Sequence, residues 1–345
     1  MNDRLCSAAV GSSQAALLGS LSGHYWTLRD YVGTVLRPPE PPPSRPWTTE
    51  LEDPEVGPIR LRGHLSEGSG ELADHLLIVV HGITGCAESG YARRAAAVAS
   101  KWGLACLRLN LRGADRSGED FYHAGLTDDL HAVLLSADLD RFPAIHVLGY
   151  SLGGHVALRF ATEVEDPRVR SVAAVSAPLD LSGCAAALDR TSSGLYRRRI
   201  LKGLAEVYSR VAERREVPVD VAQIREVRSI REFDGLTVVP RFGFADVDDY
   251  YTRMSVGPLL QSLRRPALLA YGAADPLVPE ATLEPYLRRP IERLSVWRIS
   301  PGGHVGFPPA ANRGQSGPPG VESQLISWSL SVSAEESATG LSSVG

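Results

Sequence analysis

The sequence predicts an α/β protein with a mostly parallel central sheet that has helices on both faces. Short apolar runs with the length of buried strands recur along the 345-residue chain, and segments with helical spacing separate them. This alternation is typical of parallel sheets, because the crossover between two parallel strands usually holds a helix. Apolar residues make up 43% of the chain, enough for a large core. The length fits one large domain with an insertion as well as two average domains.

The strands and helices follow in chain order from this alternation. Strands are expected at residues 59–65, 76–81, 104–109, 144–148, 169–175, 267–271 and 294–299. Helices are expected at residues 91–102, at 126–139, after residue 151 and from near residue 279. The alternation breaks between residues 178 and 255, where the apolar positions of 196–216 recur at helical spacing on one face. We therefore expect a helical insertion in the sheet domain.

The two ends of the chain differ from the middle in composition. Residues 37–46 are too rich in proline for helix or sheet, so we expect an extended spacer across the surface rather than a ligand for a peptide-binding domain. The expected organisation is an N-terminal arm at 1–54, a core at 55–178 and 256–335, an insertion at 179–255 and a disordered tail at 336–345.

Composition and charge exclude several classes of protein. The formal net charge of −4 gives no reason to expect a nucleic-acid partner, and no segment approaches the roughly 18 apolar residues that span a bilayer. The four cysteines are scattered without C-x-x-C pairs, which suits reduced thiols and neither disulfides nor zinc. The N-terminus lacks the continuous apolar region of a signal peptide, so a cytoplasmic location is expected. Peripheral contact with a membrane and the oligomeric state stay open.

A glycine-flanked serine marks the point where one strand gives way to a helix. Ser151 lies in the pattern G-x-S-x-G, between Gly149 and Gly153, after the apolar run of residues 144–148. The glycines allow close backbone approach, and the turn lifts the hydroxyl beside a helix N-terminus. A five-residue match also occurs by chance in surface turns, but the strand-to-helix setting favours a nucleophile.

Two further reactive side chains follow later strands. Asp275 lies in the turn after residues 267–271, and His304 lies in the loop after residues 294–299. A serine hydroxyl needs a base before it attacks a carbonyl, and a histidine held by an aspartate is the usual base. Asp275 alone can be a turn residue and His304 alone a loop histidine. Their order after Ser151 and their place at one sheet edge favour a Ser-His-Asp triad.

An acyl-transfer site also needs donors for the negative charge that develops on the carbonyl oxygen. The loop H-G-x-x-G from His81 follows the strand at 76–81, and it can turn the Ile83 amide toward Ser151. The Leu152 amide, just after the serine, is the second expected donor. We expect His81 to hold the loop rather than to titrate in catalysis. His155, one turn after Ser151, is expected to be a buried, hydrogen-bonded histidine more readily than a group that tunes the pocket.

Several stretches resemble the α/β-hydrolase superfamily, and more narrowly its YheT / ABHD1-ABHD3 branch. They run from about residue 22 to residue 307 and read SGHYWTL, NLRG, HAGLTDDL, GYSLGGH, REFDGLTV to GFADVDDYYTRMS, and PGGHVGF. The resemblance implies the α/β-hydrolase fold and carries the triad over to Ser151, Asp275 and His304. His155 departs from the pattern, because relatives commonly have asparagine there. This departure puts the detail of the pocket in doubt and leaves the triad untouched.

The insertion resembles the helical cap of this superfamily. Its apolar stripe from residue 196 to 216 can roof an acyl pocket, and the substrate-pocket candidates are His155, Phe242, Phe244, Tyr250 and Tyr251. For the four aromatic residues, packing of the cap on the core is an equal alternative. Arg197, Arg198 and Arg199 can form a solvated charged face or meet an anionic head group.

The expected function is that of a serine hydrolase acting on small-molecule carboxylic esters with an apolar acyl group, through an acyl-enzyme on Ser151. This chemistry needs no metal and no organic cofactor. Acyl transfer to an alcohol stays open, because the same acyl-enzyme serves both reactions. A catalytically silent binding module with this fold is a further alternative.

Overall fold

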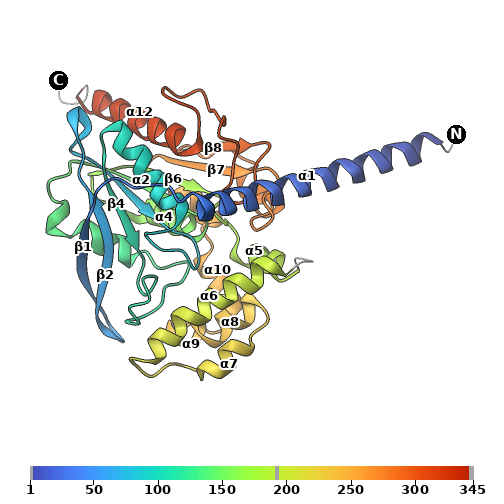
Figure 1. The fold of residues 1–345 in the computed structure, drawn as a ribbon, viewed down its shortest axis with the longest axis horizontal. Coiled ribbons are helices and arrows are strands. Elements are labelled where there is room, and N and C mark those ends of the chain that lie inside the picture. The colour runs from blue at the N-terminus through green and yellow to red at the C-terminus, as the bar shows by residue number, and fades with distance from the viewer. Residues whose placement is uncertain (1–2, 191–193, 342–345) are drawn as a thin grey trace.

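The computed structural model describes residues 3–190 and 194–341, with the backbone alone at residues 3–18, 20 and 336–341. An eight-stranded sheet with the order β1-β2-β4-β3-β5-β6-β7-β8 forms its centre (Figure 1). The strands are β1 (Arg45–Asp53), β2 (Gly57–Ser66), β3 (His75–Val80), β4 (Ala105–Asn110), β5 (Ala144–Tyr150), β6 (Val169–Val175), β7 (Ala267–Gly272) and β8 (Leu294–Ile299). β3 to β8 are parallel, whereas β1 and β2 are antiparallel to their neighbours.

Helices cover both faces of this sheet, as the alternation predicts. Alternate residues of the strands point to opposite sides, so Leu76 and Ile78 pack toward one group of helices and Leu77 and Val79 toward the other. The first group is α3 (Asp128–Leu134), α4 (Leu152–Glu163) and α11 (Glu280–Leu287). The second group is α2 (Gly90–Trp102) and α12 (Val321–Leu341). The helix expected over 126–139 is shorter, since α3 ends at Leu134 and a 3₁₀ turn, η2 (Ala137–Leu139), follows.

A cap of short helices lies between β6 and β7 in the sequence. Its helices are α5 (Leu181–Arg190), α6 (Leu195–Ala212), α7 (Val221–Glu226), α8 (Ile230–Leu236), α9 (Val238–Arg241) and α10 (Val247–Met254), and a 3₁₀ turn, η3 (Gly257–Ser262), leads back to the sheet. The cap has its own apolar core, which includes Tyr208, Phe233 and Tyr250. Arg241 of α9 pairs with Asp53 and Asp120 at 3.0 and 2.7 Å, which ties the cap to the sheet domain.

The N-terminal region is more ordered than the expected arm. β1 pairs with β2 along its whole length, and Trp47 is buried against the core. The alternation of buried and exposed residues in β1 is difficult to recognise in the sequence, because charged residues occupy this exposed edge strand. A 34-residue helix, α1 (Asp3–Leu36), precedes it. Its C-terminal part crosses the body and its N-terminal part projects beyond it (Figure 1), and no described helix is apolar and long enough to cross a membrane.

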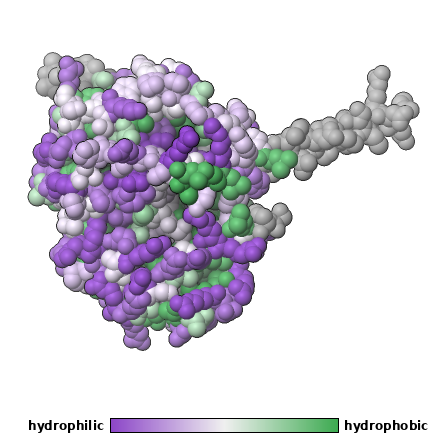
Figure 2. Space-filling model, viewed as in Figure 1, coloured by the Kyte–Doolittle hydropathy of each residue, from purple (hydrophilic) through white to green (hydrophobic). Residues whose placement is uncertain are grey.

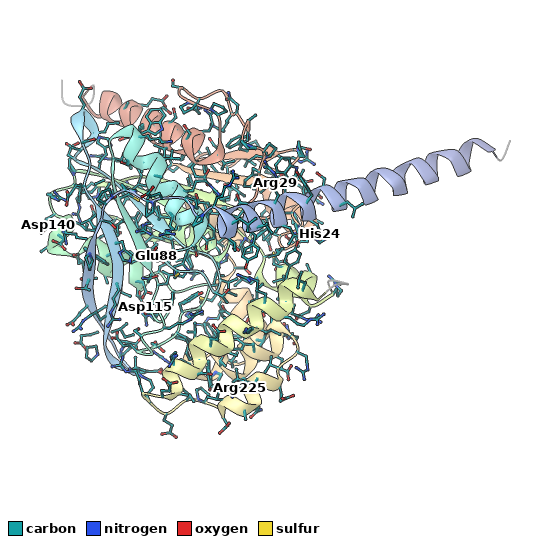
Figure 3. All side chains as sticks on the ribbon, viewed as in Figure 1. His24, Arg29, Glu88, Asp115, Asp140 and Arg225 are labelled. Atoms are coloured by element: carbon teal, nitrogen blue, oxygen red, sulfur yellow. The ribbon has the colours of Figure 1, made fainter. Side chains whose placement is uncertain are left out.

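The described part of α1 lies against the loops that follow β7 and β8. A β-carbon on Gly23 would meet the Ala274 carbonyl oxygen at 1.7 Å, so the helix backbone touches that loop directly. Figure 2 shows hydrophobic side chains gathered where this part of α1 crosses the body, and Figure 3 labels His24 and Arg29 on it.

The disordered tail expected at 336–345 overlaps α12, which continues to Leu341. The N-terminal half of α12 is anchored by the buried side chains of Leu325 and Trp328. The alanine and glutamate residues that follow favour continuation of the helix. The prediction was wrong for 336–341, and residues 342–345 lie outside the described residues.

Candidate active site

The turn between β5 and α4 holds Ser151 in a strained conformation. Its φ of +52° and ψ of −120° lie outside the regions that non-glycine residues normally adopt. A β-carbon on Gly149 would lie 2.2 Å from the Gly153 carbonyl oxygen, and one on Gly153 would lie 2.3 Å from the His81 carbonyl oxygen. Both flanking glycines are therefore required by close backbone contacts, as the sequence pattern predicts.

Ser151, His304 and Asp275 form one continuous hydrogen-bonded chain. The serine Oγ lies 2.9 Å from His304 Nε2, and His304 Nδ1 lies 2.9 Å from Asp275 Oδ2. The amides of Leu277 and Val278 both donate to Asp275 Oδ1 at 2.9 Å, which fixes the carboxylate. Because Asp275 accepts at Nδ1, the neutral imidazole carries its proton there and presents an unprotonated Nε2 to the serine.

Helix α1 holds the loop that carries His304. The Thr27 Oγ1 accepts a hydrogen bond from the His304 amide at 2.8 Å and donates one to the Gly23 carbonyl at 2.8 Å. The next amide in the loop, that of Val305, donates to Ser176 Oγ at 3.1 Å. Sequence reasoning did not single out Thr27, although it lies in the SGHYWTL stretch, because nothing local shows that a residue 277 positions away meets His304.

The loop after β3 places the Ile83 amide between two amides that already have partners. The Gly82 amide donates to the Tyr91 hydroxyl at 3.0 Å, and the Thr84 amide donates to the Tyr122 hydroxyl at 2.8 Å. Among the described contacts, no acceptor lies within hydrogen-bond distance of the Ile83 amide. The Leu152 amide begins α4, where helix geometry supplies no acceptor. A β-carbon on Gly82 would lie 3.0 Å from Ser151 Cβ, so this loop borders the serine.

His81 is a structural residue of this loop. Its Nδ1 donates to the Gly82 carbonyl at 2.8 Å, and its Nε2 accepts from the Leu111 amide at 3.1 Å. Complete burial lowers the pKa of His81 to about 4, so the ring is neutral near pH 7. These bonds match the expectation that His81 holds the loop.

His155 does not line either cavity that reaches Ser151, so its place among the pocket candidates is wrong. It points from α4 toward the base of the cap, with Nδ1 2.7 Å from the Pro178 carbonyl and Nε2 2.9 Å from the Met254 carbonyl. Burial lowers the pKa of His155 to about 4, although both carbonyls favour the charged form. The ring joins the cap to α4, the buried role that the sequence favoured.

A small cavity of about 100 Å³ lies between Ser151 and the cap. Ser151, His304 and Ile83 border it at one end, and mostly apolar side chains of the cap and core close it, among them Leu152, Leu181, Leu188, Ile200, Leu204, Ile230, Phe233 and Leu277. The apolar face of α6 contributes two of these residues and so forms part of its roof.

Of the four aromatic pocket candidates, only Tyr250 lines this cavity. Phe242 and Phe244 instead pack around the His123 ring, at centroid distances of 4.4 and 5.7 Å. Tyr251 lies behind the cavity wall and donates its hydroxyl to Asp234 Oδ2 at 2.7 Å. The pocket assignment is therefore wrong for Phe242, Phe244 and Tyr251, which pack the cap onto itself and onto the core.

Asp234 is the one carboxylate among the residues that line the cavity. Burial raises the pKa of this carboxyl to about 7, so protonated and ionised forms coexist near neutral pH. The sequence offered one signal for it, because Asp234 lies within the REFDGLTV stretch.

A second cavity of about 510 Å³ also reaches Ser151 and His304, from the side of α1. Its walls come from α1, from the loop that holds Ile83, and from the start of α6, including Leu28, Val35 and Arg199. The serine thus lies between a small apolar cavity and a larger one. Among the described residues, no group of three or more His, Cys, Asp or Glu side chains is arranged to hold a metal ion.

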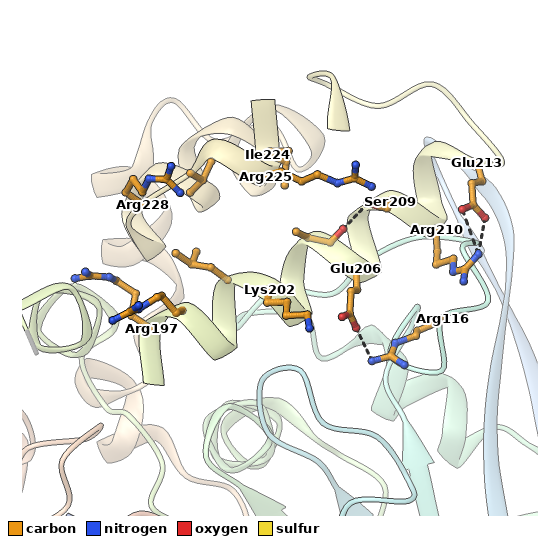
Figure 4. A pocket seen from close by; sticks show the side chains of 14 residues that line it. Arg116, Arg197, Lys202, Glu206, Ser209, Arg210, Glu213, Ile224, Arg225 and Arg228 are labelled. Carbon is orange, nitrogen blue, oxygen red and sulfur yellow. Dashed lines mark hydrogen bonds and ion pairs between the residues drawn. The ribbon is translucent and has the colours of Figure 1, made fainter. Parts of the chain in front are cut away.

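A third hollow, of about 970 Å³, lies on the outer side of the cap between α6 and α7 (Figure 4). Basic side chains dominate it, but Arg116 pairs with Glu206 at 2.7 Å and Arg210 with Glu213 at 3.0 Å. Neither Ser151 nor His304 borders this hollow. It therefore lies apart from the chain of Ser151, His304 and Asp275.

Comparisons with known proteins agree with this geometry. The model of the alpha/beta hydrolase family matches residues 77–313. The esterase-type protein YheT of Escherichia coli (strain K12) is 33% identical over 241 residues, which cover 67% of this chain and 70% of YheT. The monoacylglycerol lipase of Saccharomyces cerevisiae is 26% identical over 68% of this chain, and human phospholipase ABHD3 is 25% identical over 67%.

The chain spans only 55% of that lipase and 58% of that phospholipase. The family match nevertheless covers more than half of this chain and includes β5, α4 and the loops with Asp275 and His304. The chain therefore belongs to the alpha/beta hydrolase family, and within it to the carboxylic ester hydrolases of the YheT / ABHD3-like branch.

Proposed function

We propose that this protein hydrolyses carboxylic esters with an apolar acyl group through an acyl-enzyme on Ser151. The observation that carries the proposal is the unbroken chain from Ser151 through His304 to Asp275, which opens on a cavity with mostly apolar walls. Two relatives bear the names monoacylglycerol lipase and phospholipase, which supports lipid esters as the substrate class.

In the first step, Ser151 Oγ attacks the ester carbonyl carbon while His304 Nε2 takes the hydroxyl proton. The Ile83 and Leu152 amides stabilise the negative charge on the carbonyl oxygen, a contribution of roughly 3 kcal/mol for each such donor. The ester C–O bond then breaks, and His304 returns the proton to the leaving alcohol. Asp275 holds the proton on Nδ1 and stabilises the charged ring.

In the second step, water attacks the acyl carbon while His304 accepts its proton. The bond to Ser151 Oγ breaks, the carboxylic acid leaves, and the proton returns to the serine. The small apolar cavity under the cap would hold the acyl group. The larger cavity beside α1 would hold the leaving alcohol and admit water.

Acyl transfer is a second candidate because the larger cavity borders the same serine and has room for an alcohol. An alcohol that replaces water in the second step gives a new ester. Rates measured with an added alcohol separate the two reactions, since an ester product moves the assignment to a transferase.

The nucleophile can be tested with a fluorophosphonate probe. The wild type is expected to be labelled and Ser151→Ala is not, and kcat for a p-nitrophenyl ester should fall by about 10⁴-fold. Equal labelling of both proteins would contradict the role of Ser151. If neither is labelled, the fold serves a binding function instead.

The apolar acyl group can be tested with p-nitrophenyl esters of increasing chain length. We expect kcat/KM to depend strongly on chain length, because each buried methylene contributes about 0.8 kcal/mol until the cavity is full. A rate that does not vary with chain length would argue against the cavity as the acyl site.

A further inference from the structure

Helix α1 carries an apolar stripe on the face that points away from the body. The stripe consists of Leu21, Tyr25, Leu28, Val32 and Val35, which recur every three or four residues and are each 40% to 59% exposed. Figure 2 shows hydrophobic side chains at this place on the surface. Exposed apolar side chains gathered in one patch mark an interaction surface.

The opposite face of α1 is already occupied by the body. Gly23 and Thr27 contact the loops with Asp275 and His304, Asp30 pairs with Arg94 at 2.8 Å, and Thr34 packs on α2. The docked face and the stripe lie on opposite sides of the helix. The stripe is therefore free to contact a partner while α1 stays attached.

The stripe borders the larger cavity that leads to Ser151. Leu28 and Val35 line this cavity together with Ser151 and His304. A molecule held at the stripe is therefore adjacent to an opening that reaches the serine. This continuity indicates that the partner contains the substrate.

Three arginines lie beside the stripe. Arg29 stacks on the Trp26 ring at 5.0 Å, and Arg199 of α6 stacks on the Tyr31 ring at 4.3 Å. Neither of them nor Arg37 has a carboxylate within 4.0 Å among the described residues. The only carboxylate of residues 19–38 is Asp30, which Arg94 already pairs.

We propose that the apolar stripe of α1 docks the protein on a lipid membrane with anionic head groups. Apolar and aromatic side chains would enter the boundary between head groups and acyl chains, while Arg29, Arg37 and Arg199 would meet the phosphates. The lipid ester would then pass through the larger cavity to Ser151, a step that rests on the proposed function. A symmetric contact between two copies would gather the same arginines at one interface, where the nearby carboxylates of Asp30 and Glu88 are already paired, so the membrane is the better partner.

Docking is tested by sedimentation with vesicles of phosphatidylcholine, alone or mixed with phosphatidylglycerol. The wild type is expected to bind the mixed vesicles more tightly than the neutral ones, and Leu21→Glu/Val32→Glu should reduce binding by about tenfold or more. Neither residue lines a cavity at Ser151. Arg29→Gln/Arg199→Gln should reduce binding to the mixed vesicles alone and weaken its dependence on salt.

The matched control is Gly19→Glu/Gly33→Glu. It adds the same two charges to the same helix at positions where a new β-carbon meets nothing within 4 Å. We expect it to lose less binding than Leu21→Glu/Val32→Glu, because its charges lie off the stripe, although Glu at position 33 is one helical turn from Arg29 and Arg37. Equal loss in both double variants would show that added charge alone weakens binding and would overturn the role of the stripe.

Three other outcomes would overturn the proposal. They are failure of the wild type to bind either vesicle, equal binding to both vesicles, and a lipid-free dimer that dissociates in Leu21→Glu/Val32→Glu. Vesicle binding is also measured with Ser151→Ala. The docking test therefore does not depend on whether the protein hydrolyses esters. With active protein, the stripe variant should lose hydrolysis of a vesicle-bound ester and retain that of a soluble short-chain ester.

Discussion

Thr27 is the side chain through which α1 holds the backbone of His304. Its Oγ1 accepts the His304 amide at 2.8 Å, and Gly303 packs on the same hydroxyl. Thr27→Val keeps the shape but leaves this amide without its acceptor, a cost of about 1–3 kcal/mol. We expect kcat to fall about tenfold because His304 shifts relative to Ser151.

Thr27→Ser provides the control, since it keeps the hydroxyl and should restore most of the rate. Steady-state kinetics would separate a fall in kcat from a rise in KM, and thermal melting would show whether the fold is intact. If the valine and serine variants had the same kcat, Thr27 would have no positioning role.

At this scale the sequence predicted the residues that follow strand ends. Ser151, Asp275 and His304 each lie in the turn or loop that follows a recognisable strand, so the sheet edge brings them near one another. The contacts of Thr27 and Tyr122 join segments far apart in the chain, which no local pattern records. The prediction of Phe242, Phe244 and Tyr251 as pocket residues was wrong for a related reason. An aromatic residue buried in the cap and one that lines a cavity look the same in the sequence.

Helix α6 contributes part of the roof of the small cavity. Ile200 and Leu204 face it from the apolar side of the helix. Leu204→Trp would fill much of a cavity of about 100 Å³. We therefore expect the rate for long-chain p-nitrophenyl esters to fall about tenfold or more relative to the acetate ester.

A matched control on the same helix is Arg210→Trp, because Arg210 is exposed and pairs only with Glu213 among the described residues. It adds the same side chain outside the cavity, so the chain-length profile should match that of the wild type. A parallel shift in both variants would attribute the effect to α6 as a whole rather than to the cavity.

The elements differ in how well the sequence predicted them. β3 and β7 are almost wholly apolar and β5 and β6 are mostly apolar, so all four were found, whereas β1 lies at the sheet edge and is mostly charged or polar. The apolar positions of α1 are separated by serine and glycine, and among its described side chains Leu21, Tyr25, Leu28, Val32 and Val35 face outward rather than into a core. Contacts with α2 and with the loops after β7 and β8 show why that helix stays on the body.

The whole molecule contains four buried histidines that are neutral in the folded state. Burial lowers the pKa of His81 and His155 to about 4 and that of His123 and His146 to about 3. The unfolded chain binds these protons below about pH 6.5, so stability is full above that pH and is lost as the pH falls toward 4. Each histidine can lower the free energy of unfolding by up to about 2 kcal/mol between pH 6.5 and 5.

Asp234 affects the stability in the opposite direction. Its pKa is raised to about 7, so lowering the pH protonates the buried carboxylate and stabilises the fold. Four histidines outweigh one carboxyl, so we expect the Tm to fall between pH 7.5 and 5. His155→Asn removes one of the four groups and should lessen that fall. A Tm that stays level over this range would contradict the prediction.

The attachment of Thr27 to the His304 loop also concerns the order in which the chain is made. The two residues are 277 positions apart, so α1 leaves the ribosome long before the loop that it holds exists. During synthesis the contacts of α1 with α2 can form early, but its contact with the His304 loop waits until β8 and that loop have been made. The site is thus completed by one of the last contacts of folding, and a nascent chain that stops before His304 has no base for its serine.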